Sequence, residues 1–329
     1  LVREETSPED LQGMALAQGI VTLKGGATSH GAVVARGMGK CCVTGCSEIK
    51  IDEINKTMTV GKYTLKEGDF ISVSGHTGEI YLGKIPLKEN SFSDELKEFV
   101  SWASEIKRMG VRMNADTPED VEQGKAFGAK GIGLCRTEHM FFKHNKIWTI
   151  REFILSDRGE EKEKALKKLH NLQKEDFLNI FKILNGDEAN IRLLDPPVHE
   201  FLPKTLEDKE KMAEILSISL EAVEKRIYRL KDENPMLGHR GCRLGVSYPE
   251  LYRIQARAII EAAYECAKKG IKVHPEIMIP FIMEAKELAY LRKEIEEEIE
   301  SFFKEVGEKV EYKLGTMIEI PRACLLANE

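Results

Sequence analysis

The sequence predicts an α/β protein with two domains. Strand-like and helical segments alternate along most of its 329 residues, which is typical of sheets whose strands are connected by helices. A chain of this length corresponds to about two domains of ~100–200 residues each. Apolar residues make up 42% of the chain, which is enough for sizeable hydrophobic cores.

Composition and charge argue against several classes of function. The net charge of −6 and the pI near 5.9 make nucleic acid an unexpected partner, because phosphate backbones attract basic surfaces. No apolar run reaches the ~18 residues of a membrane span, so we expect no membrane partner. The seven cysteines contain no Cys-x-x-Cys pair, a usage typical of a reducing compartment. We expect a cytoplasmic location, with organelle targeting as the alternative. Cys41, Cys42 and Cys46 match no zinc spacing and are expected to be buried thiols.

Residues 1–86 form the first predicted domain. A serine followed by a proline at residues 7 and 8 predicts the start of a helix. Glycine-containing turns separate most of the short strand candidates that follow. The predicted strands cover residues 21–23, 42–44, 57–60, 70–73 and 79–82.

One loop of this domain carries the clearest chemical signal, Gly25-Gly26-Ala27-Thr28-Ser29-His30. Two glycines allow a sharp turn, and Thr28 and Ser29 stand where a helix N-cap is expected, directly before His30. The positive end of a helix dipole disfavours imidazolium and favours an anion, so it suits a neutral histidine that accepts a phosphoryl group. The alternative is an ordinary helix cap with an exposed histidine.

Residues 87–107 predict a linker helix, with apolar residues at helical spacing. The second domain, residues 108–329, alternates strands and helices as a parallel sheet does. Its predicted strands cover residues 111–115, 132–135, 191–194, 276–282 and 314–319.

The predicted helices of the second domain begin with Thr117 as a cap before Pro118. Two long amphipathic helices are predicted over residues 211–229 and 249–268. The highly charged region 141–190 also reads as helical, and residues 160–168 are expected to be a solvated face.

Charged side chains lie at or near the carboxyl ends of three predicted strands. Arg136 follows one strand, Arg192 lies within the next, which ends just before Asp195, and Glu319 ends the last. Barrel enzymes build their active sites at the carboxyl ends of strands. The planar fork of arginine suits both phosphate and carboxylate. The alternative is that Arg136–Glu138 and Arg192–Asp195 are structural ion pairs.

The stretch from Gly25 to Gly37, continued as Met-Gly-Lys-Cys-Cys, resembles the phosphohistidine domain of the phosphoenolpyruvate-utilising enzymes. Its continuation is most similar to the dikinases of that family. Ala27 stands where methionine is usual and Gly31 where alanine is usual. The resemblance implies a swivelling β/α phosphohistidine domain followed by an N-terminal portion of a (β/α)8 TIM barrel. It also implies that the barrel is truncated after about strand five, which would leave open sheet edges and an aggregation-prone chain.

The resemblance also implies roles for individual residues. His30 would form the tele-phosphohistidine intermediate, Arg136 and Arg192 would bind the substrate phosphate, and Arg240 would lie near the transferring phosphoryl group. Glu319 would bind Mg²⁺, completed by an acidic residue beyond the chain end, and a monovalent cation is a second expected cofactor. Thr28 and Ser29 are expected to be regulatory or capping residues. His239 is expected to be structural, and Cys324 is expected to be buried.

The implied reaction interconverts ATP, phosphate and pyruvate with AMP, diphosphate and phosphoenolpyruvate. ATP would bind a nucleotide domain that precedes Leu1, the full-length protein would be a homodimer, and this chain alone would be inactive. Three alternatives stay open: phosphoenolpyruvate synthase, a phosphohistidine carrier of the phosphotransferase Enzyme I type, and a non-catalytic remnant.

Overall fold

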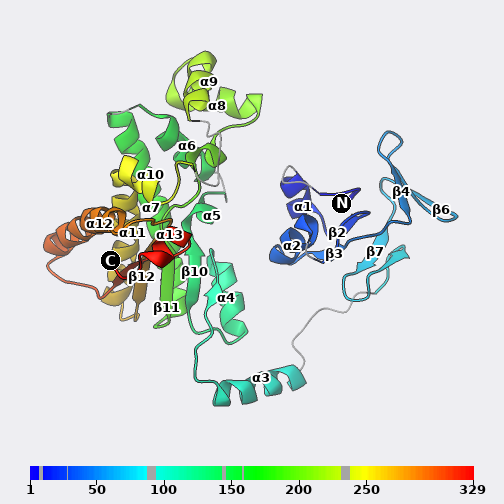
Figure 1. The fold of residues 1–329 in the computed structure, drawn as a ribbon, viewed down its shortest axis with the longest axis horizontal. Coiled ribbons are helices and arrows are strands. Elements are labelled where there is room, and N and C mark those ends of the chain that lie inside the picture. Colours follow the sequence, from blue (N-terminus) through cyan, green and yellow to red (C-terminus); the bar gives the residue numbers. More distant parts are fainter. Residues whose placement is uncertain (7–9, 28, 87–93, 143–145, 158, 231–237) are drawn as a thin grey trace. The chain divides into compact units, whose positions relative to one another are not determined.

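The computed structural model describes residues 1–6, 10–27, 29–86, 94–142, 146–157, 159–230 and 238–329. The predicted helix start at residues 7 and 8 lies outside them. The chain divides into two compact units, Leu1–Ser104 and Glu105–Glu329, and each is described by itself (Figure 1).

A small parallel sheet with strand order β1-β2-β3 forms one part of the first unit. Met14, Ile20 and Ala35 are fully buried and make a small core beside this sheet. The predicted strands near residues 21 and 42 are confirmed as β2 and β3. The elements of this part are β1 (Val2–Arg3), α1 (Leu11–Leu16), β2 (Gly19–Thr22), α2 (His30–Gly37) and β3 (Cys41–Val43).

Antiparallel strands form the rest of the first unit. Strands β4, β5 and β6 make one sheet, and β7 pairs with β8 in another. Three of these strands were predicted, whereas β4 and β6, the two edge strands of the three-stranded sheet, were missed. The bounds are β4 (Ile49–Asp52), β5 (Thr57–Val60), β6 (Tyr63–Lys66), β7 (Ile71–Ser74) and β8 (Glu79–Leu82). Helix α3 (Asp94–Ile106) then confirms a helix within the predicted linker.

Five parallel strands, in the order β13-β12-β11-β10-β9, form the sheet of the second unit. Neighbours in the sheet are also neighbours in sequence, as in consecutive strands of a (β/α)8 barrel. All five predicted strands are found, but the one predicted over residues 191–194 begins earlier and ends at Arg192, and the last one ends at Thr316, before Glu319. The strands are β9 (Met113–Asn114), β10 (Ile132–Arg136), β11 (Glu188–Arg192), β12 (His274–Ile279) and β13 (Lys313–Thr316).

Helices connect these strands. Thr117 caps α4 as predicted, because its Oγ1 accepts a hydrogen bond of 3.3 Å from the backbone N–H of Asp120. The helices and the 3-10 turn η2 are α4 (Pro118–Ala126), α5 (Thr137–Phe141), α6 (Lys146–Leu155), α7 (Glu160–Leu184), η2 (Val198–Phe201), α8 (Leu206–Leu216), α9 (Leu220–Arg229), α10 (Cys242–Ser247), α11 (Pro249–Lys268), α12 (Ala285–Val306) and α13 (Pro321–Leu325).

The single helix predicted over residues 211–229 is wrong. The chain forms two helices there, because Ser217 adopts a left-handed conformation with φ 53° and ends α8. Ser219 then caps α9, with its Oγ accepting from the N–H of Ala222 at 3.2 Å. Serine competes with helix-interior hydrogen bonds through its hydroxyl, which explains the break.

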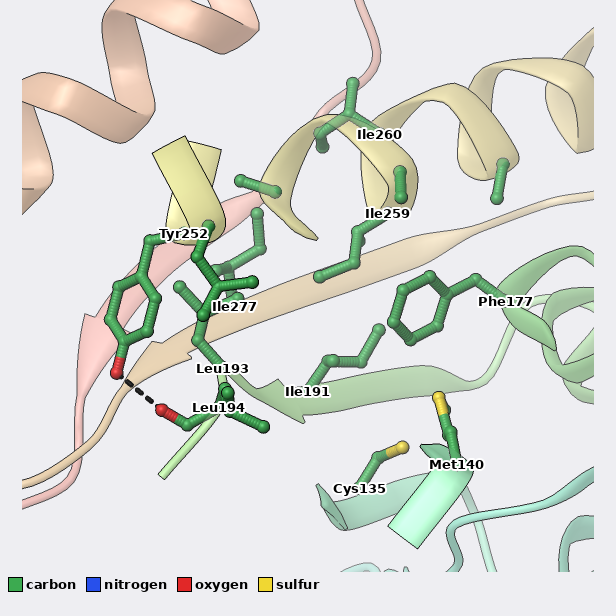
Figure 2. Close-up of a cluster of buried hydrophobic side chains, with 14 of the residues drawn as sticks. Cys135, Met140, Phe177, Ile191, Leu193, Leu194, Tyr252, Ile259, Ile260 and Ile277 are labelled. Carbon is green, nitrogen blue, oxygen red and sulfur yellow. Dashed lines mark hydrogen bonds between the residues drawn. The ribbon is translucent and has the colours of Figure 1, made fainter. Parts of the chain in front are cut away.

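The main core lies between the sheet of the second unit and helices α7 and α11, which pack against each other (Figure 1). Figure 2 shows Phe177 of α7 facing Ile191 of β11, with Ile259 and Ile260 on α11 above the strands. Tyr252 is fully buried, and its hydroxyl donates a hydrogen bond of 2.7 Å to the carbonyl of Leu194. This core holds the carboxyl ends of β10 and β11 beside each other.

Candidate active site

The carboxyl ends of two neighbouring strands carry two of the predicted arginines. Arg136 is the last residue of β10, Arg192 is the last residue of β11, and the two are register partners in the parallel ladder. Side chains at matching register positions of neighbouring parallel strands lie on the same face of the sheet. The backbone therefore brings Arg136 and Arg192 together, as the strand-end reading of the sequence expected.

Asp195 connects Arg192 to the third predicted arginine. Arg192 is 9% exposed, and its Nη1 lies 3.2 Å from Asp195 Oδ2. Arg240 donates from Nη2 to the same carboxylate oxygen at 2.5 Å and from Nε to Asp195 Oδ1 at 3.3 Å. Asp195 itself is 2% exposed. One buried carboxylate thus orients two guanidinium groups.

Glu138 is the second buried partner of Arg192. The Arg192 guanidinium donates to Glu138 Oε1, and both residues are almost fully buried. The alternative interpretation therefore holds for Arg192 and Asp195, which do form an ion pair. Glu138 pairs with Arg192, whereas the alternative had placed it with Arg136. Within the described residues, Glu138 Oε2 and Arg192 Nε are buried polar atoms without a hydrogen-bond partner. Buried unpaired atoms beside an arginine cluster leave capacity for a polar ligand.

For both Glu138 and Arg192, burial and the neighbouring charges shift the pKa in opposite directions. Burial raises the pKa of Glu138, and the nearby Arg192 only partly offsets it. Burial lowers the pKa of Arg192, but the carboxylates of Glu138, Asp195 and Glu319 outweigh this and raise it. Arg192 is therefore held as a buried cation, which is the charge that a phosphate or carboxylate ligand requires.

Arg136 is positioned through its backbone. Its N–H donates to Asp116 Oδ1 at 2.6 Å, and the other oxygen of Asp116 lies 2.7 Å from His139 Nδ1. The Arg136 side chain is half-buried. Asp116 was not among the predicted site residues, although its position just after the first strand of the sheet could have indicated it.

Glu319 lies between β13 and α13 and has an exposed side chain. Its Oε1 accepts a hydrogen bond of 2.9 Å from the backbone N–H of Phe281, which follows β12. In the part of the chain that the structure describes, no group of three or more His, Cys, Asp or Glu side chains could hold a metal ion. The donor chemistry of Glu319 suits Mg²⁺, but these residues supply only part of a site.

His30 is the first residue of α2, and only its backbone is described. Ser29 is the N-cap residue in an extended conformation, and its side chain makes no capping hydrogen bond. Thr28 lies outside the described residues. Arg36, near the end of α2, donates from Nη2 to the carbonyl of Ala27 at 3.2 Å and so connects the loop to the helix.

Three other predictions concern cysteines and a histidine. Cys324 is exposed on the short helix α13, so the expectation of burial is wrong because this helix covers little of the core. Cys41, Cys42 and Cys46 are free and half-buried, which corrects the expectation of full burial. His239 Nε2 lies 2.8 Å from Ser247 Oγ, a contact that fits the expected structural role.

Two family models match the chain. The PEP-binding domain of PEP-utilising enzymes matches residues 90–329, and the mobile domain of PEP-utilising enzymes matches residues 1–78. Together with the strand order, these matches confirm the expected fold class, a swivelling domain followed by an N-terminal portion of a barrel. No helix in the described part of the chain is long and apolar enough to cross a membrane.

The chain is also similar over its whole length to curated proteins named pyruvate, phosphate dikinase. It is 50% identical to the protein of Clostridium symbiosum over 329 residues, 100% of this chain and 38% of that relative. It is 49% identical to the protein of Giardia intestinalis, covering 37% of that relative. It is 50% identical to the chloroplastic protein of Arabidopsis thaliana, covering 34% of that relative.

The chain thus spans little more than a third of the length of these relatives. Family models cover both units, and the PEP-binding model alone covers most of the chain. The matched regions include the loop before α2 and the arginine-bearing strand ends. The chain therefore belongs to the PEP-utilising enzymes.

Proposed function

We propose that the protein carrying this chain is a pyruvate, phosphate dikinase. It would interconvert ATP, phosphate and pyruvate with AMP, diphosphate and phosphoenolpyruvate. The observation that carries the proposal is the identity of 47–50% with dikinases across the chain. None of the relatives reported above is named as a synthase or a carrier, so the dikinase is favoured over these two alternatives.

The first station of the proposed reaction is His30. The N-terminus of α2 (His30–Gly37) favours a neutral imidazole and a nearby anion, as a phosphohistidine requires. Residues 1–86 would move as one swivelling domain, with residues 87–107 as the linker and residues 108–329 as the barrel portion. Thr28 would be a regulatory or capping position in this loop, together with Ser29.

The second station is the arginine cluster. The phosphoryl group of phosphoenolpyruvate would pass from its enol oxygen to an imidazole nitrogen of His30, and the enolate would take up a proton at its methylene carbon to give pyruvate. Arg136, Arg192 and Arg240 would orient the phosphoryl group and balance its charge. Positioning and charge stabilisation are the main sources of catalysis in phosphoryl transfer.

Glu319 would supply one carboxylate ligand to Mg²⁺, with an acidic residue outside this chain completing the site and a monovalent cation as a second cofactor. The bound metal would neutralise negative charge on the substrate oxygens. Support comes from the Phe281 N–H, which holds one Glu319 oxygen at 2.9 Å and so orients the carboxylate. Since magnesium keeps several waters, a single protein carboxylate can be a sufficient contribution from this region.

ATP would bind a domain outside this chain, and the full-length protein would be a homodimer. A cytoplasmic location is supported by the seven cysteines, all of which are free.

The test is substitution in the full-length protein. His30→Ala should abolish both half-reactions, whereas Arg192→Ala should abolish only the exchange between pyruvate and phosphoenolpyruvate. Arg292→Ala is the matched control, because Arg292 is an exposed arginine on α12 that pairs with Glu296. Exchange of ATP with AMP and diphosphate that survives in His30→Ala would refute the proposal.

A further inference from the structure

Phe281 has an unusual backbone conformation at the edge that carries the candidate site. It follows β12 and has a φ of +65°, in the left-handed region. A bulky residue rarely adopts this conformation, which persists only where the surrounding structure holds the residue in place. The Phe281 side chain is 5% exposed, so surrounding groups do enclose it.

The residues before α10 hold Phe281 in this conformation. Gly241 has a φ of +54°, and a Cβ added to it would lie 2.3 Å from Phe281 Cβ, so the Phe281 side chain packs directly against the backbone of Gly241. The Cys242 Sγ donates to the carbonyl of Phe281 at 3.0 Å, and the Cys242 N–H donates to the carbonyl of Pro280 at 3.0 Å. Contacts on both sides of the peptide therefore fix the strained residue.

Two of the proposed functional groups rest on Phe281. Its backbone N–H donates to Glu319 Oε1 at 2.9 Å. Its ring lies under two guanidinium groups, with the Cζ atoms of Arg240 and Arg243 at 5.0 and 5.3 Å from the ring centroid. These distances are within the range of cation–π attraction. The angle φ sets the directions of the N–H and of Cβ relative to each other. The left-handed conformation therefore lets the N–H of Phe281 point to Glu319 while its ring lies against Arg240 and Arg243.

We propose that Phe281 is a positioning residue that couples the metal-binding carboxylate of Glu319 to the phosphate-binding guanidinium of Arg240. This proposal rests on the proposed function. The backbone N–H sets the orientation of Glu319, and the ring, together with Asp195, sets the orientation of Arg240. On this proposal, Phe281 contacts neither the metal ion nor the phosphoryl group.

Two substitutions separate the two contacts. Phe281→Leu removes the aromatic face but keeps an apolar side chain against Gly241, so Arg240 should lose its support while Glu319 keeps its N–H donor. Phe281→Ala removes most of the side chain that pins the backbone, so the residue should relax to negative φ and turn its N–H away from Glu319. Phe177→Leu is the matched control, because Phe177 is a fully buried ring in the main core of the second unit.

The experiment uses the full-length protein in a His30→Ala background, so that phosphoenolpyruvate binds without reacting. Calorimetry measures its affinity, and electron paramagnetic resonance measures the affinity for Mn²⁺ alone. We expect phosphoenolpyruvate to bind about fivefold more weakly to Phe281→Leu, a typical cation–π effect, with unchanged Mn²⁺ affinity. Phe281→Ala should weaken both, and Phe177→Leu neither. With His30 restored, Phe281→Leu should raise KM for phosphoenolpyruvate more than it lowers kcat.

Phosphoenolpyruvate affinity in Phe281→Leu that equals wild type, or an equal loss in Phe177→Leu, would overturn the proposal. Unchanged Mn²⁺ affinity in a folded Phe281→Ala would do the same. Where Phe281→Ala does not fold, as judged by circular dichroism, the comparison of the two leucine variants decides. Failure of the proposed function is a separate result, since it would appear as a wild-type protein that forms no pyruvate from phosphoenolpyruvate.

Discussion

The two units of this chain differ in how they bury their side chains. The first unit has a small core around Met14, Ile20 and Ala35, and much of its antiparallel part is half-buried or exposed. The second unit has a large core between a five-stranded parallel sheet and its helices, and a smaller cluster around Met212 and Val223. In the second unit the proposed site lies at the edge of a large hydrophobic core. In the first unit the proposed nucleophile lies on a short helix that packs against a small core.

The largest expected effect comes from the deep core. Phe177→Ala should destabilise the second unit by about 3–5 kcal/mol, because it removes a fully buried ring whose surroundings cannot collapse into the cavity. The matched change in the first unit, Met14→Ala, should cost about 2 kcal/mol, because a small core relaxes more easily. Hydrogen exchange measures the opening free energy in each unit separately. An equal cost for the two substitutions would contradict the comparison.

The same difference decides what the sequence could predict. Helix α11 was predicted with correct bounds, because Pro249 marks its start and its apolar residues face a deep core. All five strands of the second sheet were predicted for the same reason. In the first unit β4 and β6 were missed although β8, which is as short and no less exposed, was predicted, so exposure alone does not explain the difference.

Site residues divide in a similar way. Arg136 and Arg192 were predictable because strand ends and register are properties of the backbone pattern. The pairing of Glu138 with Arg192 and the bridging by Asp195 depend on side-chain geometry across neighbouring elements, which one sequence does not contain. Phe281 was missed because its left-handed conformation is imposed by Gly241 and Cys242, which are distant in sequence.

Two carboxylates, the half-buried Glu261 and the buried Glu138, sharpen the comparison within the second unit. Burial raises the pKa of Glu261, but contacts with His170, Arg257 and Lys174 outweigh it and lower the pKa to about 2. Glu138, at the proposed site, has fewer cations and a raised pKa. The structural carboxylate is thus stabilised as an anion, whereas the one at the site is not.

Glu261→Gln should therefore destabilise the protein by about 2–3 kcal/mol near neutral pH, at ~1.4 kcal/mol for each pKa unit. A carboxylate with a lowered pKa contributes stability above its unfolded pKa, near 4.5, and loses it as the pH falls toward 2. Urea unfolding of both proteins from pH 7 to pH 3 measures this difference. A difference that does not shrink with acidification would show that Glu261 acts through packing and not through its charge.

A substitution at Gly31 tests whether the small core of the first unit is nevertheless tightly packed. The sequence suggested that glycine in the first turn of α2 costs about 0.5–1 kcal/mol relative to alanine. However, a Cβ at Gly31 would lie 2.4 Å from the Oγ1 of buried Thr6. Gly31→Ala should then destabilise the first unit by about 1 kcal/mol, because overpacking costs ~1–3 kcal/mol and outweighs the gain in helix propensity.

The double variant Thr6→Ala/Gly31→Ala removes the obstructing hydroxyl and should recover most of that stability, as hydrogen exchange in α2 would report. If Gly31→Ala alone stabilises the first unit, the side chain of Thr6 turns aside without cost. The first unit would then be loosely packed at the helix that bears His30, and the contrast between the two units would be larger than the structure indicates.

The smallest expected effect concerns the contact between His139 and Asp116 beside the backbone of Arg136. The Asp116 carboxylate, which accepts a hydrogen bond from His139 Nδ1 at 2.7 Å, raises the pKa of His139 although burial lowers it. A histidine with a raised pKa contributes stability that is complete below its unfolded pKa, near 6.5, and is lost as the pH rises through the folded value. The His139 side chain is 52% exposed, so solvent screens the contact and the change in stability should be small.

Nuclear magnetic resonance titration of His139 resolves this effect better than unfolding does. Asp116→Asn should lower the pKa of His139 toward 6.5, because the amide keeps the hydrogen bond but not the charge. The same substitution weakens the acceptor for the Arg136 N–H, which lies 2.6 Å from Asp116 Oδ1. If the pKa of His139 is the same in both proteins, Asp116 acts only as the acceptor for the Arg136 N–H. The charge of Asp116 then has no effect on His139, and packing alone sets the structure at this edge of the core.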